Sequence, residues 1–253
     1  MDQTKIAIVT GGSRGLGKNT ALKIAKNGTD LIITYHNNKE MADEVVAEIQ
    51  KIGRKAKAFQ LDASNSKEFT EFVEKISTYL NDTYQRGNFD YLINNAGTGG
   101  HASFENATEE EFDSLVNVHF KGVYFLTQKL LPLLNDGGCI VNISSGLARF
   151  SHPNTSMYAS VKGAIEVVSR ILAVELGARK IRVNTIAPGA IQTDFNGGNV
   201  RDNENVNKMI SNLTALGRAG VPDDIGGVIA FLCTEDARWI NGQRIEVSGG
   251  MHL

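Results

Sequence analysis

Several features are scarce in this chain of 253 residues, and each scarcity narrows what the protein can be. Two cysteines, Cys139 and Cys233, are too few for a disulfide framework, and their apolar surroundings predict buried thiols. No apolar run approaches the ~20 residues that a membrane span needs. The net charge is only -2, from 26 basic and 28 acidic side chains. A nucleic-acid binder would need a basic excess, which this sequence lacks.

The chain also lacks linkers, internal repeats and low-complexity tracts. A chain of this length with no proline-rich or serine-rich stretch suits one domain, residues 1–253, with one substantial core. The first residues run straight into a strand-like segment, with no basic region and apolar stretch before it. We therefore expect no secretory signal and a cytoplasmic protein. We also expect no metal site and neither a membrane nor a nucleic-acid partner.

What the sequence does contain is an alternation of short apolar runs and helical patterns. The apolar runs show no in-and-out alternation, which is typical of strands covered on both faces, as in a parallel sheet. This order predicts right-handed crossovers and a doubly wound α/β domain. The expected strands are 5–10, 30–35, 55–61, 90–94, 138–144, 181–187 and 244–247, and the expected helices are 15–27, 39–52, 65–81, 108–134, 155–178 and 222–234.

One stretch, residues 195–216, departs from this alternation. Its first half is polar and rich in glycine, and its second half has apolar residues at helical spacing. Long loops in compact domains often cover active sites, so we interpret 195–216 as a substrate lid. An ordinary surface helix on a long loop is the alternative.

A glycine-rich turn, TGGSRGLG, ends the first expected strand and leads into the first expected helix. Glycine lets the backbone approach a pyrophosphate closely, and the helix N-terminus supplies free N–H groups and positive potential. The turn therefore predicts a dinucleotide site, although a purely structural turn is the alternative. The expected contacts from this turn are Gly11, Ser13, Arg14, Gly15, Leu16 and Gly17.

The end of the second expected strand indicates which dinucleotide binds. An acidic residue in this region usually binds the ribose 2′-hydroxyl of NAD. Here the sequence reads YHNNK, and the first carboxylate, Glu40, falls in the next expected helix. Arg14 could pair with a 2′-phosphate through two hydrogen bonds, and His36 lies in the same region. We therefore predict NADP(H) rather than NAD(H).

Two further segments follow the third and fourth expected strands, at the edge of the sheet where ligands bind. Asp62 follows the third strand, and the run NNAG, residues 94–97, follows the fourth. The small residues Ala96 and Gly97 leave room for a ribose or a ring against the backbone. Asp62 could equally cap the next helix, and Asn94 could be an ordinary turn residue.

The strongest chemical signal is the pair Tyr158 and Lys162, with Ser145 thirteen residues before the tyrosine. Residues at i and i+4 share a face of a helix, so the Lys162 ammonium is expected to lower the pKa of the Tyr158 phenol. The Ser145 hydroxyl could then hold a carbonyl oxygen near that acid. The same spacing recurs at Tyr35 and Lys39, where no serine precedes it, so the context of Tyr158 carries the prediction.

Taken together, these motifs resemble the short-chain dehydrogenase/reductase family over essentially the whole chain. The pattern comprises the glycine-rich turn, NNAG, Asn117, Ser145, the Tyr158–Lys162 pair, Pro188-Gly189 and the terminal VSGG. It is most similar to NADP-linked 3-oxoacyl-carrier-protein reductases and carbonyl reductases. The resemblance implies a Rossmann-type sheet of seven parallel strands. It also implies a homotetramer formed through helices 108–134 and 155–178.

The resemblance also implies a role for each matching residue. Ser145 would bind the substrate oxygen, and Tyr158 would be the general acid in reduction. Lys162 would lower the pKa of the phenol and bind the nicotinamide ribose, and Asn117 would hold a water that links Lys162 to solvent. Asp62 would contact the adenine end, Asn94 the ribose, and Pro188, Gly189 and Thr193 the nicotinamide.

The sequence thus predicts an NADPH-dependent reductase that converts a ketone or aldehyde to an alcohol. A 3-oxoacyl thioester reductase and a sugar or polyol dehydrogenase are alternatives within the same chemistry. A non-catalytic NADP(H)-binding sensor is an alternative of another class. The candidate substrate contacts are Leu147, Phe150, His152 and Phe195.

Overall fold

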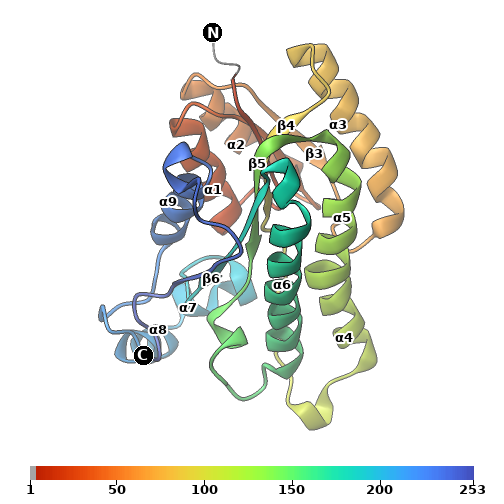
Figure 1. Cartoon of the computed structure of the whole chain (residues 1–253). Helices are drawn as coiled ribbons and strands as arrows, with labels where there is room; N and C mark the ends of the chain where they lie inside the picture. Colours follow the sequence, from red (N-terminus) through yellow and green to blue (C-terminus); the bar gives the residue numbers. More distant parts are fainter. Residues whose placement is uncertain (1–3) are drawn as a thin grey trace.

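The computed structural model describes residues 4–253, so Met1, Asp2 and Gln3 of the expected signal-free start lie outside the described residues. Seven strands form one parallel sheet in the order β3-β2-β1-β4-β5-β6-β7, with helices on both faces (Figure 1). This confirms the predicted Rossmann-type domain. The strands are β1 (Ile6–Val9), β2 (Asp30–Tyr35), β3 (Ala56–Gln60), β4 (Phe89–Asn94), β5 (Leu134–Ile143), β6 (Arg182–Pro188) and β7 (Arg244–Val247).

The strand order reverses at β1, which pairs with β2 on one side and with β4 on the other. Chain connections leave this point in opposite directions, so a crevice opens at the carboxyl ends of β1 and β4. The predicted turn follows β1, and the predicted NNAG run overlaps the end of β4. The fold therefore brings these two segments to the same place.

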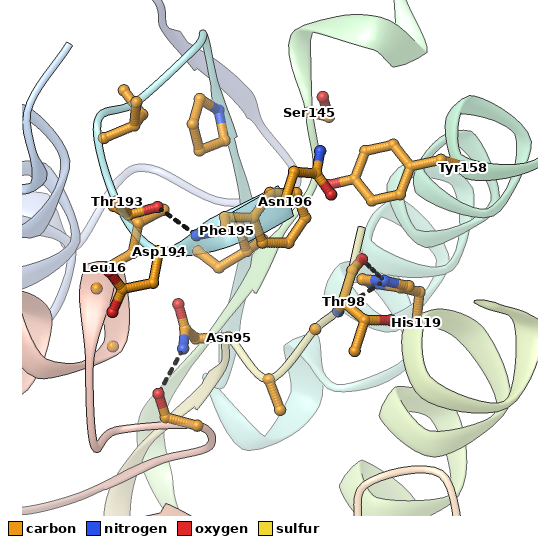
Figure 2. A pocket seen from close by; sticks show the side chains of 18 of the residues that line it. Leu16, Asn95, Thr98, His119, Ser145, Tyr158, Thr193, Asp194, Phe195 and Asn196 are labelled. Carbon is orange, nitrogen blue, oxygen red and sulfur yellow. Dashed lines mark hydrogen bonds between the residues drawn. The ribbon is translucent and has the colours of Figure 1, made fainter. Parts of the chain in front are cut away.

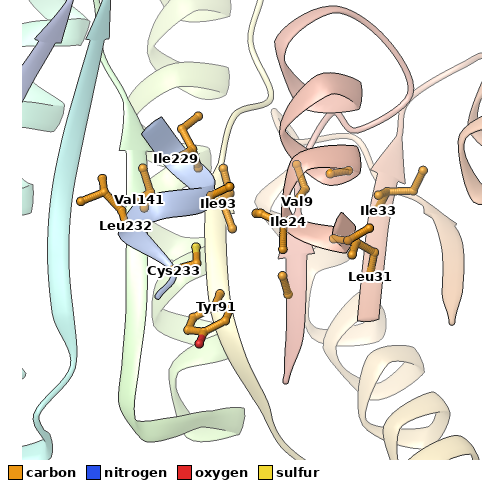
Figure 3. Packing of buried hydrophobic residues seen from close by; sticks show 14 of the residues in the cluster. Val9, Ile24, Leu31, Ile33, Tyr91, Ile93, Val141, Ile229, Leu232 and Cys233 are labelled. Atoms are coloured by element: carbon orange, nitrogen blue, oxygen red, sulfur yellow. The ribbon is translucent and has the colours of Figure 1, made fainter. Parts of the chain in front are cut away.

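Alternate residues of the buried strands face two separate cores. Ala7 and Val9 of β1 pack in the cluster under α1, α2 and α9, whereas Ile6 and Ile8 pack under α3, α5 and α6. Figure 3 shows part of the first cluster, where Ile229 and Leu232 of α9 lie against the strands. Both faces of β1, β2 and β4 are buried, which explains their continuous apolar runs, whereas the edge strand β3 is partly exposed.

The helices follow the predicted pattern, with one interruption. Residues 108–134 were expected to form one helix, but α4 and α5 are separated by a π-helical stretch, Asn117–Gly122. Gly122 is in close contact with the carbonyl of Ala63, where a side chain would not fit. The helices are α1 (Gly15–Lys26), α2 (Lys39–Lys51), α3 (Phe69–Tyr84), α4 (Glu109–Val116), α5 (Val123–Leu130), α6 (Ser156–Glu175), α7 (Asn199–Asp202), α8 (Glu204–Asn212) and α9 (Pro222–Leu232).

A buried carboxylate holds the start of β4 against β1. The carboxylate of Asp90 accepts hydrogen bonds from the Ile6 backbone at 2.9 Å and from Arg86, Lys5 and Asn135 at 3.0–3.2 Å. Asp90 is 2 % exposed, and a buried carboxylate is costly unless it is paired and hydrogen-bonded as it is here. It joins three segments that are far apart in the chain.

The small number of cysteines and the lack of long apolar runs led to two expectations that can be compared with the structure. Cys139 and Cys233 are buried free thiols, as predicted. Among residues 4–253, none of the helices combines the length and the apolar character needed to cross a bilayer.

Candidate active site

A cavity of about 840 Å³ lies over the carboxyl ends of the central strands. Residues from eight separate parts of the chain line it, including the turn after β1, the segment after β4 and the start of α6. A cavity of this size is in the range that encloses cofactors and small ligands. Of the predicted cofactor contacts, those that line it are Gly11, Ser13, Arg14, Gly15, Leu16, Gly17, His36, Asp62, Ala96, Gly97, Tyr158, Lys162, Pro188, Gly189 and Thr193.

The glycine-rich turn is packed so tightly that side chains would block it. Gly11 has φ +62°, and a Cβ there would lie 3.0 Å from the Ala96 backbone. A Cβ on Gly17 would overlap the carbonyl of Gly11. The α1 N-terminus has no side-chain cap and no acidic residue in its first turn, so its N–H groups can bind a phosphate. This cradle fits a dinucleotide.

The end of the cavity near the start of α2 contains both basic and acidic groups. Arg14 is exposed beside the turn, and α2 begins at Lys39, which places Glu40 inside that helix as expected. His36 Nε2 lies 3.8 Å from the Asp62 carboxylate. Burial works against the charged form of Asp62, but hydrogen bonds from Ser64 outweigh it and lower the pKa of Asp62.

The two asparagines of the NNAG run face different ways. Asn94 is buried and donates to Thr127 and Asn142, so its side chain does not line the cavity. Asn95 lines the cavity, and its amide donates to the carbonyls of Thr10 and Gly11 (Figure 2 shows the bond to one of them). Asn95 therefore fixes the turn after β1 to the end of β4. The expected ribose contact was its neighbour, Asn94.

Tyr158 and Lys162 lie on one face of α6 and both line the cavity. Lys162 Nζ is 5.5 Å from the centroid of the Tyr158 ring and donates to the carbonyl of Ile143 at 2.8 Å. Burial lowers the pKa of Lys162 to about 7. Burial also raises the pKa of Tyr158, so the expected acidification of the phenol is not seen for the chain by itself. The cause is desolvation, because removing a phenolate from water disfavours its charged form.

Ser145 follows β5 and lines the same cavity. Its hydroxyl accepts a hydrogen bond from the Leu147 backbone at 3.2 Å, which leaves its own hydrogen available to a ligand. Arg244 Nη2 donates to the Ser145 carbonyl and is itself paired with Glu166 and Glu246. This ion-pair network holds the segment that carries Ser145.

Asn117 and His119 lie in the π-helical stretch, and only the second of them lines the cavity. The His119 ring is 1 % exposed and lies edge-on to the Tyr158 ring, with centroids 5.3 Å apart (Figure 2). Asn117 lies in the π-helical stretch that packs against α6, and its expected role in holding a water for Lys162 stays a prediction. No pattern in the sequence distinguished His119, because a histidine within a helical segment is unremarkable by itself.

The end of the cavity that holds the candidate substrate contacts is lined largely by apolar side chains. The four predicted substrate contacts, Leu147, Phe150, His152 and Phe195, all line it. Phe195 lies near Tyr158, with ring centroids 6.1 Å apart. Residues 195–216 form a short turn, α7 and α8, and their contribution to the cavity wall is Phe195, Asn196, Asn199, Val200, Val206, Met209 and Ile210. Their movement as a lid stays a prediction.

The geometry can be compared with known proteins. A family model described as enoyl-(acyl carrier protein) reductase matches residues 11–252. The chain is 39% identical to an uncharacterized oxidoreductase of Methylorubrum extorquens over 98% of this chain and 97% of that protein. This chain belongs to the short-chain dehydrogenase/reductase family. The resemblance inferred from the motifs is confirmed.

Other proteins that this chain resembles have more specific names. A hydroxynaphthalene reductase-like protein, Arp2, of Metarhizium brunneum is 38% identical over 97% of this chain and 94% of that one. The solved structure of LugOII, a promiscuous reductase that catalyses keto-reduction at C1 during lugdunomycin biosynthesis, has a TM-score of 0.94 and 34% identity, covering 99% of both chains. The landomycin C-6 ketoreductase LanV, solved with bound NADP and rabelomycin, has a TM-score of 0.90 and 34% identity, covering 99% of this chain and 97% of that one.

Proposed function

We propose that this protein is an NADPH-dependent carbonyl reductase that converts a ketone to a secondary alcohol. The observation that carries the proposal is that one cavity joins the phosphate-binding turn to Tyr158, Lys162 and Ser145. NADP is bound in the solved structure of LanV, and the glycine cradle beside Arg14 fits the same group. When bound, NADPH supplies the hydride.

The residues of this chain then control the substrate oxygen. Ser145 donates a hydrogen bond to that oxygen, and Tyr158 transfers its proton to it as negative charge develops. A positive charge on Lys162 stabilises the phenolate that remains. Overall, one ketone, one NADPH and one proton give one alcohol and one NADP+. General acid catalysis of this kind contributes ~10²–10⁴-fold to the rate.

The apolar wall supports a ring ketone as the substrate class. Phe150, Phe195 and Met209 can pack against a hydrophobic ring, whereas a sugar would need hydrogen-bond partners for each hydroxyl. The named activities of LugOII and LanV are keto-reductions. A 3-oxoacyl thioester reductase and a sugar dehydrogenase are the alternatives to test.

The test is oxidation of NADPH at saturating cofactor against a panel of ring ketones, 3-oxoacyl thioesters, enoyl thioesters and sugars. We expect turnover with ring ketones and a kcat/KM for NADPH above that for NADH. In Tyr158→Phe, kcat should fall by ~10²-fold or more while NADPH still binds. NADPH binding without turnover across the panel would identify a sensor instead, and undiminished kcat in Tyr158→Phe would remove the phenol from the mechanism.

The assembly proposed here is a homotetramer. Val167, Ile171 and Val174 form an apolar stripe along α6 and are 51–81 % exposed. Tyr124 and Phe125 on α5 are also exposed. Burying these faces between copies would remove their exposed apolar side chains from water. Light scattering should give four times the monomer mass, and a monomer at micromolar concentration would contradict the proposal. The cytoplasmic location stays a prediction.

A further inference from the structure

His119 is a buried titratable group that the proposed mechanism does not use. It lies in the π-helical stretch between α4 and α5, is 1 % exposed and lines the cavity. Its ring meets that of Tyr158 edge-on, at an interplanar angle of 86°. A polar side chain in this position needs a partner for each of its nitrogens.

One nitrogen of His119 has a clear partner and the other has none. Nε2 lies 2.7 Å from the Thr98 carbonyl oxygen and 3.2 Å from the Thr98 backbone nitrogen. The shorter contact requires a hydrogen on Nε2, because two lone pairs would repel at 2.7 Å, so Nε2 donates to the carbonyl. The neutral ring then has a lone pair on Nδ1. Nδ1 is buried without a hydrogen-bond partner among residues 4–253.

Lys162 provides the complementary group beside the same ring. Its ammonium has three N–H bonds, one of which is directed to the Ile143 carbonyl. Nζ lies 5.5 Å from the centroid of the Tyr158 ring, and the His119 centroid lies 5.3 Å from it. Burial and the charge of Lys162 lower the pKa of His119 to about 3, so the imidazole is a neutral acceptor at physiological pH. The unpaired acceptor of His119 and the remaining N–H donors of Lys162 thus both lie beside the Tyr158 ring.

We propose that His119 is a positioning residue for Lys162: its Nδ1 accepts a hydrogen bond from the ammonium through one water and keeps that group charged beside Tyr158. This inference deepens the proposed function and rests on it. Gly97 leaves the space for the imidazole, since a Cβ on residue 97 would lie 2.6 Å from His119 Cε1. Asn117, for which the family resemblance implied a water-holding role, lies two residues earlier in the same stretch.

The environment of Lys162 contains few other groups that could change its charge state. Its own helix contributes Tyr158 and Glu166, and the Glu166 carboxylate is bonded to Arg244 of β7 and to the Ser144 hydroxyl of the segment after β5. The π-helical stretch contributes His119. Glu166 is already paired with Arg244. We therefore expect the loss of the His119 Nδ1 acceptor to change the charge state of Lys162 directly, and not through Glu166.

Three substitutions separate the two nitrogens of His119. In His119→Asn the side-chain amide lies about where Nδ1 lies, whereas in His119→Gln it lies about where Nε2 lies and can still bond to Thr98. His119→Phe keeps the aromatic edge against Tyr158 and removes both nitrogens. The proposal requires that His119→Asn behave like the wild type. It also requires that His119→Gln and His119→Phe do not. Thermal unfolding of each variant establishes that it is folded.

The first readout is the pKa of Lys162 in the protein without cofactor. It is measured by competitive labelling with formaldehyde and cyanoborohydride across pH, followed by mass spectrometry of the peptide that contains Lys162. We expect the wild type and His119→Asn to agree, and His119→Gln and His119→Phe to have a value lower by about one unit. This readout needs no turnover, so it tests the inference even if the proposed function fails.

The second readout is the pH profile of kcat with a ring ketone. Removing the acceptor favours neutral Lys162, so the loss of activity toward high pH should begin about one pH unit earlier in His119→Gln and His119→Phe. KM for NADPH should change little. Equal pKa values in all variants, or a wild-type value in His119→Gln but not in His119→Asn, would overturn the inference. A wild type that fails to reduce any ketone while the pKa values differ as expected would count against the proposed function alone.

Discussion

Asn196 lies so close to Gly99 that no side-chain carbon could be added to residue 99 without overlapping the Asn196 amide. Asn196 belongs to the segment proposed as a lid, and Gly99 follows β4, between Thr98 and Gly100, which line the cavity. Asn196, Gly197 and Gly198 have φ values of +52°, +67° and +79°. This left-handed run directly follows Phe195, whose ring centroid lies 6.1 Å from that of Tyr158.

Gly99→Ala should therefore disturb the substrate end of the cavity. The added methyl group displaces Asn196, and a shift of ~1 Å in a positioning group can cost ~10²-fold in rate, so we expect kcat/KM for the ketone to fall by about 10- to 100-fold. NADPH affinity should remain near that of the wild type. Gly227→Ala on α9, where an added carbon meets nothing within 4 Å, is the control. Unaltered kinetics in Gly99→Ala would remove the support for a lid over this site.

Arg14→Ala should distinguish the two dinucleotides. Arg14 is exposed beside the phosphate-binding turn, where its guanidinium can reach a 2′-phosphate. A hydrogen bond to a charged group contributes about 1.5–3 kcal/mol, so KM for NADPH should rise by ~10-fold or more while KM for NADH stays constant. Lys26→Ala, at the other end of α1, controls for the lost positive charge. Equal effects on both cofactors would place Arg14 elsewhere in the site.

Lys162→Met should stabilise the fold while it removes activity. Burial lowers the pKa of Lys162 from 10.5 to about 7, so below pH 7 the folded protein holds a costly charge. Between pH 7 and 10.5 the unfolded chain binds the additional proton, and wild-type stability rises with pH. The variant should therefore be more stable by about 3–5 kcal/mol near pH 6, with this advantage lost toward pH 10. Urea unfolding at several pH values measures it, with Lys26→Met as the exposed control. An advantage that does not vary with pH would mean that packing, not charge, is responsible.

Asp90→Asn should destabilise the protein without changing its chemistry. The substitution leaves the Arg86 guanidinium, which is 9 % exposed, beside a neutral group. Breaking a buried ion pair costs about 3–5 kcal/mol. Asp136→Asn is the matched control, because Asp136 pairs with Arg179 but is 72 % exposed, and it should cost less than ~1 kcal/mol. Similar midpoints of urea unfolding for the two variants would contradict this account of Asp90.

The sequence predicts most of this fold because each of its signals is local. Continuous apolar runs mark the strands, and the glycine-rich turn lies between β1 and α1 as predicted. The direction in which a single polar side chain points is harder to predict from the sequence. Asn94 and Asn95 are adjacent, and the end of β4 decides which of them faces the core and which faces the cavity.

The π-helical stretch shows a second limit of prediction. It inserts an extra residue into a helical turn, so side-chain directions after it no longer follow the period of 3.6. Asn117 was expected to hold a water for Lys162 because of its place in a motif, and that role stays a prediction, whereas no pattern in the sequence gave a reason to expect His119, which lines the cavity. The raised pKa of Tyr158 was also beyond the sequence, because it depends on how completely the ring is buried.

The pairing of β1 with β4 has a consequence for the order in which the protein forms. The hydrogen bond from the Asn95 backbone to Thr10 closes a loop of 85 residues, and the Tyr158–Lys162 helix is still farther along the chain. Such distant pairings are slow to form. On the ribosome, the glycine-rich turn emerges long before β4 and α6 exist to complete its pocket. A nascent chain therefore cannot capture a nucleotide early, and ligand binding can help only the last stages of folding.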